Sequence, residues 1–173
     1  MIKKISYKLL LISIIIGACS GIVISLFRIT IPKIMSLISN LINFGQENII
    51  NSIIFVLIFI FLGFFVSISV NKEPMIGGSG IPQIAGKLHN KLDYSALSCL
   101  INKIIGGLVS IGSGLTLGRE GPSVQIGGCL GEVLAKKFKL DREDTKTMII
   151  ASSACGITSA FTAPISAMAF ALE

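Results

Sequence analysis

Charged residues are scarce in this chain of 173 residues. They make up 14% of it, whereas a typical soluble domain contains about 25%. Hydrophobic residues account for 52%, and the mean hydropathy is +0.84. This shortage of charge excludes an ordinary water-soluble domain and predicts that most of the chain faces lipid or the interior of a protein.

Residues that hold metals or perform covalent chemistry are also few. The single histidine, His89, lies between Lys87 and Lys91 and is expected at the surface. Four cysteines lack CxxC spacing and are predicted to be free thiols packed as small hydrophobes: Cys19, Cys99, Cys129 and Cys155. The Gly-Lys-Ser/Thr ending of a phosphate-binding loop is missing, which argues against the alternative of a nucleotide-binding enzyme. We therefore expect no enzyme activity and no cofactor.

Two long uncharged runs stand out near the N-terminus, residues 9–27 and 49–71. Each reaches the length of about 18–20 residues that a helix needs to cross a bilayer. A signal peptide is the alternative for the first run, because Lys3, Lys4 and Lys8 precede it. The run is too long for the apolar region of a signal peptide and lacks a convincing cleavage site after it. We therefore interpret both runs as retained membrane spans.

The net charge is +6, and its placement favours a topological role over a nucleic-acid partner. The basic residues lie in short polar gaps, and the gap 136–146 holds five basic residues and three acidic ones. Basic residues concentrate on the cytoplasmic side of membrane proteins. The pattern predicts a multi-pass protein of the cell membrane with a cytoplasmic N-terminus.

After the second span the apolar segments become shorter and are interrupted by glycine and proline, as in 123–135 and 163–172. Such segments cannot each cross a bilayer as straight helices. Backbone that breaks at membrane depth must be buried in protein or line a cavity. An all-α membrane fold of broken, half-spanning helices is therefore expected. Glycines four residues apart predict close helix packing: Gly17/Gly21, Gly114/Gly118 and Gly127/Gly131.

Two glycine motifs share one physical plan, residues 77–82 and 118–122. In each, glycines free the backbone, and a proline (Pro82 or Pro122) falls in the first turn of the apolar helix that follows. Each motif therefore predicts a helix N-terminus inside the membrane, whose unpaired N–H groups form a ready anion site. Residues 162–164 are a weaker third example.

Ser79 and Glu120 are the residues expected to act on an ion. Ser79 lies at or near the first helix start, where its hydroxyl donates to a bound halide or, in the plainer interpretation, caps the helix. Glu120 is an ionisable residue in an apolar setting, and intramembrane carboxylates are costly unless functional. When ionised it competes with an anion for the N–H groups, and when protonated it releases them. A pair with the neighbouring Arg119 is disfavoured, because adjacent helical residues point apart.

Two other basic residues have structural interpretations. Arg119 is expected to hold backbone carbonyls or a distant carboxylate. Lys103 is expected to extend towards the membrane surface, with an anion-attracting role as the alternative.

At these residues the chain resembles the CLC family of chloride channels and proton/chloride antiporters. Residues 78–82 are similar to the family signature GSGIP, and residues 118–122 are similar to GREGP. Residues 123–128 match the start of the same family helix, and 160–164 resemble the segment AFNAP. The two signatures occur in the family's order and at its spacing.

The resemblance implies the inverted-repeat CLC fold, with residues 1–173 as the N-terminal part of its membrane domain, and homodimers when complete. It implies an anion site at Ser79, Gly80, Ile81 and Gly121, with Glu120 as the gating and proton-carrying residue. The motif-shaping residues would be Gly78, Pro82, Gly118, Arg119 and Pro122. Chloride is implied as the transported ion, moved passively by a voltage-gated type of channel or exchanged for protons.

Several parts of the family pattern are missing. The second repeat is absent, with its GxFxP motif and the tyrosine that completes the anion site. A non-transporting fragment or assembly subunit that needs a second half is therefore the alternative function. Glu173 lies one position before the expected second glutamate of antiporters. Gln83 stands where many bacterial relatives have glutamate, which is expected to affect a surface more than the pore.

Overall fold

The computed structural model describes residues 7–172, and Lys3, Lys4 and Glu173 lie outside the described residues. Within them the chain is all α, as predicted. Seven α-helices and one short 3-10 helix follow in the order α1 (Tyr7–Gln46), α2 (Ile49–Lys72), η1 (Pro74–Ile76), α3 (Ile81–Leu88), α4 (Ala96–Gly112), α5 (Glu120–Lys137), α6 (Arg142–Phe161) and α7 (Pro164–Leu172).

Helix α1 is longer than the sequence predicted. Basic residues were expected in short polar gaps between the spans, but α1 continues through Arg28, Pro32 and Lys33 and is 40 residues long. Proline removes one backbone donor, a loss that membrane helices tolerate. At about 1.5 Å per residue the helix is about 60 Å long, roughly twice the thickness of a bilayer core.

Helices α1 and α2 have the properties of membrane spans. Their most apolar 18-residue windows have mean hydropathies of 2.6 and 3.0, and only 22% and 6% of those windows are buried. Large apolar side chains such as Ile60, Phe61 and Phe64 on α2 are exposed. Such surfaces are stable against lipid and unfavourable in water, so the exposure supports the two predicted spans.

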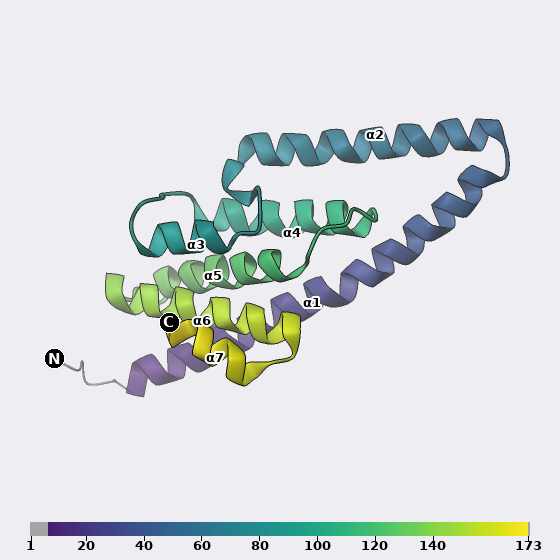
Figure 1. The fold of residues 1–173 in the computed structure, drawn as a ribbon. Helices are drawn as coiled ribbons and strands as arrows, with labels where there is room; N and C mark the ends of the chain where they lie inside the picture. The colour runs from purple at the N-terminus through teal and green to yellow at the C-terminus, as the bar shows by residue number, and fades with distance from the viewer. Residues whose placement is uncertain (1–6, 173) are drawn as a thin grey trace.

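Helix α5 lies at the centre of the packed part of the molecule, between α4 and α6 (Figure 1). Its Ile126 and Cys129 are fully buried. They share a hydrophobic cluster with Ile24 and Phe27 of α1 and Cys99 of α4. The four cysteines are free thiols, as predicted.

Glycines allow α5 and α6 to pack backbone against backbone. A Cβ atom on Gly127 would overlap the Ser152 carbonyl, and one on Gly131 would lie 2.7 Å from the Met148 carbonyl oxygen. The predicted packing role is confirmed for this pair. It is wrong for Gly17/Gly21, which have open space around them, and for Gly114/Gly118, which lie outside the helices between α4 and α5.

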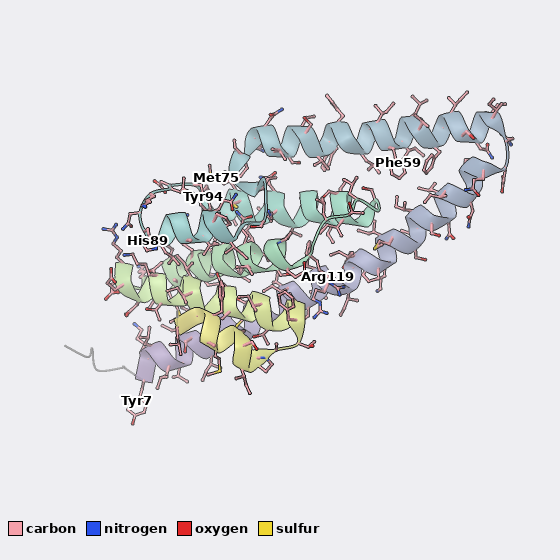
Figure 2. The ribbon with its side chains drawn as sticks, viewed as in Figure 1. Tyr7, Phe59, Met75, His89, Tyr94 and Arg119 are labelled. Carbon is pink, nitrogen blue, oxygen red and sulfur yellow. The ribbon has the colours of Figure 1, made fainter. Side chains whose placement is uncertain are left out.

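The two ends of the helix cluster differ in charge. At one end, on the left in Figure 1, lie the start of α1, the α3–α4 loop and the α5–α6 loop. Basic residues gather here, and the exposed His89 marks this end in Figure 2. Asp141 caps α6 by accepting a 2.8 Å hydrogen bond from the backbone N–H of Asp144. The α1–α2 turn lies far from this end.

Candidate anion-binding site

Both glycine motifs line one cavity of about 700 Å³. The first motif contributes Ser79 and Ile81, and the second contributes Glu120, Gly121 and Pro122. Residues of α2, η1, α4 and the α4–α5 loop form the remaining walls. Two segments about 40 residues apart in the sequence therefore meet at one site.

Helix α3 begins at this cavity without a side-chain cap. Its N-cap is Gly80, whose φ of +93° is left-handed backbone that glycine adopts readily. The Ile84 N–H donates to the Gly80 carbonyl at 3.1 Å. The plainer interpretation of Ser79 as the N-cap is therefore wrong, and the early N–H groups of α3 have no cap from a side chain.

Helix α5 begins at the same cavity and also lacks a side-chain cap. Arg119 is its N-cap residue, and the Ser123 N–H donates to the Arg119 carbonyl at 3.2 Å. The Glu120 carboxylate folds back over Gly118, where an added Cβ would lie 2.6 Å from Oε2. The carboxylate is therefore at the helix start, where an anion is stabilised by the macrodipole.

The two helix starts touch each other. A Cβ atom on Gly121 would overlap the backbone carbonyl of Ser79. Glycine is needed here because two backbones approach directly, with no room for a side chain. The positive ends of α3 and α5, each predicted from its own motif, are thus brought to one place.

Lys103 corrects a sequence prediction. It was expected to extend to the membrane surface, but its side chain is buried, with 4% exposure. Its Nζ donates to the carbonyls of Ile76 at 2.6 Å and Gly78 at 2.9 Å. The bonds compensate the burial of the ammonium and hold these carbonyl oxygens. Lys103 also lines the cavity, which keeps the anion-attracting alternative open.

Two glutamines hold the other carbonyls of the same loop. Gln83 donates to the Gly77 carbonyl at 2.7 Å, although it is not among the residues that line the cavity. Gln125, fully buried on α5, donates to the Met75 carbonyl at 2.7 Å. Sequence reasoning missed Gln125. The available signal was an uncharged amide alone in an apolar, glycine-rich helix, since buried amides require partners.

Only some of the remaining predicted residues line the cavity. Gly78 and Gly118 line it, whereas Gly80, Pro82 and Arg119 are not among its lining residues. Arg119 is exposed at the start of α5 (Figure 2). In the described part of the chain its guanidinium has neither an ion pair nor a hydrogen bond, so the expected tie to carbonyls is not seen. Helix α7 begins at Pro164, which confirms the third helix start, but it does not reach this cavity.

The charge at the cavity comes from few groups. Among its lining residues, only Lys103 and Glu120 are ionisable. Over residues 7–172, no group of three histidine, cysteine or carboxylate residues could hold a metal. The site thus combines two helix N-termini, one ammonium group and one carboxylate, and helix N-termini in general stabilise negatively charged groups.

Comparison with known proteins gives the same family as the two motifs. The profile described as "Voltage gated chloride channel" matches residues 62–173. The H+/Cl− exchange transporter ClcA of Vibrio cholerae serotype O1 is 32% identical over 98% of this chain and 37% of its own length. The ClcA of Vibrio campbellii is 38% identical over 65% of this chain and 24% of its own length.

Solved structures show the same architecture. A slow cyanobacterial Cl−/H+ antiporter aligns with a TM-score of 0.84 and 28% identity, over 96% of this chain and 40% of its own. A CLC-type fluoride/proton antiporter aligns with a TM-score of 0.72 and 21% identity, over 98% of this chain and 41% of its own. The chain spans well under half the length of these relatives.

Proposed function

The chain belongs to the voltage-gated chloride channel (CLC) family, and from this premise we propose that it takes part in transmembrane chloride transport. The observation that carries the proposal is the meeting of two helix N-termini without side-chain caps at one cavity. Their N–H groups offer partial positive charge, which binds an anion weakly enough for it to leave again.

Within this proposal, Ser79, Ile81 and Gly121 contact the ion. Ser79 offers a hydroxyl donor at the cavity wall, and Gly121 offers a backbone N–H in the first turn of α5. Gly80 acts indirectly, since its left-handed backbone starts α3. Lys103 adds a full positive charge to the cavity wall.

Glu120 is the proposed gate. Its carboxylate occupies the start of α5, where a chloride ion would gain the same stabilisation. Ionised, it excludes the anion from this position, and protonated, it loses its attraction to the N–H groups. Gate opening is thereby linked to a proton, consistent with the exchange of protons for chloride that the names of the relatives state.

The proposal extends to the assembly. The cytoplasmic side would be the end at which the basic residues gather, formed by the start of α1 and the α3–α4 and α5–α6 loops (Figure 1) and called here the lysine-rich end. The N-terminus of α1 would then be cytoplasmic, and the Glu120 side of the cavity would face the opposite side of the membrane. The complete transporter would be a homodimer in the lipid bilayer. Because the chain spans about 37% of the matched ClcA relative, the alternative is a subunit that needs a second half before it transports.

Chloride release from liposomes tests the proposal. The chain is reconstituted with chloride inside, insertion is checked by flotation, and release is followed with a chloride electrode at neutral and acidic pH. Wild-type release should accelerate in acid, because protonation of Glu120 opens the site. Glu120→Gln should release chloride at a rate that does not change with pH, while Glu143→Gln, an exposed carboxylate on α6, should behave as wild type.

Two results would count against the proposal. Equal pH dependence in Glu120→Gln and wild type would remove Glu120 from the gate. No release from an inserted wild-type chain would show that this chain alone is not a transporter and would favour the subunit alternative.

A further inference from the structure

A second cavity, of about 560 Å³, lies at the lysine-rich end of the molecule. Its walls come from the end of α3, the following loop, the last turns of α5 and the start of α6. The proposed transport site lies at the opposite end of α5, so the transport mechanism does not use these groups.

The lining of this cavity has an excess of positive charge. Four basic side chains and two acidic ones contribute, which gives a net charge of +2. The basic residues are Lys87, Lys136, Arg142 and Lys146, and the acidic ones are Asp93 and Glu132. This excess favours a negatively charged ligand over a neutral or cationic one.

An ion cluster centred on a buried carboxylate lines the cavity, with one mostly buried and one exposed lysine. Glu132 is only 4% exposed, and its two carboxylate oxygens lie 2.8 Å from Lys87 Nζ and 2.7 Å from Lys136 Nζ. Lys87 also donates to the Tyr94 carbonyl at 2.6 Å. One carboxylate therefore pairs with two ammonium groups, and the three side chains together carry a net charge of +1.

The rim carries donors suited to phosphate. Arg142 Nη2 donates to Asn90 Oδ1 at 2.6 Å, which fixes the guanidinium and leaves further N–H donors of its five. A planar guanidinium matches phosphate oxygens in pairs. Lys146, whose 3.4 Å pair with the exposed Glu143 is weak, and the Thr145 hydroxyl complete the rim.

The remaining wall is apolar and packs against a membrane span. Leu92, Leu140 and Ile149 line the cavity. Leu140 also packs against the buried Ile12 and Ile16 near the start of α1. The same part of α1 exposes apolar side chains such as Leu11 and Ile15. A polar, cationic cavity beside the apolar surface of a span matches a phospholipid, whose phosphate lies next to its acyl chains.

We infer that this cavity binds the phosphate of an anionic phospholipid headgroup in the leaflet at the lysine-rich end. Basic pockets between membrane helices on the cytoplasmic side are known to take such headgroups. The phosphate would contact Arg142 and Lys146 at the rim, above the fixed ammonium groups of Lys87 and Lys136. A free phosphate ion offers the same chemistry without the acyl chains.

Thermal unfolding of the chain in a neutral detergent distinguishes these sources. The probes are dioctanoylphosphatidylglycerol, dioctanoylphosphatidylcholine and inorganic phosphate. The pocket variant is Arg142→Gln/Lys146→Gln. The control is Lys137→Gln/Lys139→Gln, which makes the same change of charge on exposed residues at the same end that do not line the cavity.

Phosphatidylglycerol should raise the Tm of wild type and of the control pair more than phosphatidylcholine does. The pocket variant should lose at least half of that rise. Because Arg142→Gln also removes the bond to Asn90, each rise is measured from the variant's own Tm, and Lys146→Gln alone provides a milder test.

Three results would overturn the inference. They are the absence of any preference for phosphatidylglycerol, an equal loss in the control pair, and a Tm rise with inorganic phosphate but not with phosphatidylglycerol. The second would indicate diffuse surface charge, and the third would identify a soluble phosphate as the ligand. None depends on chloride transport, so failure here and failure of the proposed function are separate.

Discussion

Gly121 packs directly against the backbone of Ser79, so that a side chain on Gly121 would overlap the Ser79 carbonyl. This contact joins two motifs that are distant in the sequence and brings the starts of α3 and α5 together. The distance between the two helix starts is therefore controlled by the absence of a single methyl group.

Gly121→Ala should separate the two helix starts. Overpacking of this kind costs about 1–3 kcal/mol, and the Ser79 carbonyl is backbone that cannot rotate away. Unfolding in detergent should show this loss of stability, and titration calorimetry should show weaker chloride binding. Gly63→Ala is the matched control, because its Cβ meets no atom within 4 Å and alanine favours helix. Unchanged chloride binding in Gly121→Ala would show that the close contact does not form the site.

Local chemistry explains how much of this site was predictable. Glycine followed by proline determines a helix start from within a few residues, so the starts of α3 and α5 could be predicted. Low charge and long apolar runs likewise predicted the all-α membrane fold. These features depend on neighbouring residues in the sequence and not on contacts with distant parts of the chain.

The features that the sequence did not predict depend on contacts between residues far apart in the chain or on the surroundings of a helix. Lys103 is buried because the carbonyls of Ile76 and Gly78, 25 or more positions earlier, face it. Sequence spacing alone gave no sign of these bonds. Helix α1 continues past Arg28 and through Pro32, because other groups of a membrane protein can satisfy the carbonyl that a proline leaves unpaired. Short polar gaps do not by themselves end a helix.

Lys103→Met should weaken both stability and anion binding. It keeps most of the buried volume but leaves two carbonyls without their donor, at a cost of about 1–3 kcal/mol for each buried unpaired group. The loop 76–80 should then loosen and chloride affinity should fall, as measured by chemical unfolding and calorimetry. Lys137→Met, on an exposed lysine of α5, should change neither quantity. A variant with normal stability and normal affinity would contradict a role for Lys103 in holding the loop.

Glu132→Gln should be one of the more destabilising single-atom changes in the chain. It leaves Lys87, whose side chain is 11% exposed, without its counter-ion, and removing one partner of a buried pair costs about 3–5 kcal/mol. Glu143→Gln is the matched control, since its side chain is 75% exposed and exposed pairs contribute about 0–1 kcal/mol. Thermal unfolding should separate the two variants clearly, and similar Tm values would mean that the Glu132 cluster is solvated.

Thiol labelling in cells tests the membrane orientation. Lys139→Cys places a thiol at the lysine-rich end, between α5 and α6, and Glu47→Cys places one in the α1–α2 turn at the far end of a 40-residue helix. Basic residues are retained on the cytoplasmic side, so a membrane-impermeant reagent should label Glu47→Cys in intact cells and Lys139→Cys only after permeabilisation. The wild-type chain gives the background from its native cysteines, two of which are buried. Labelling of Lys139→Cys in intact cells would invert the orientation, placing the lipid-phosphate cavity in the outer leaflet and turning the Glu120 side of the transport cavity towards the cytoplasm.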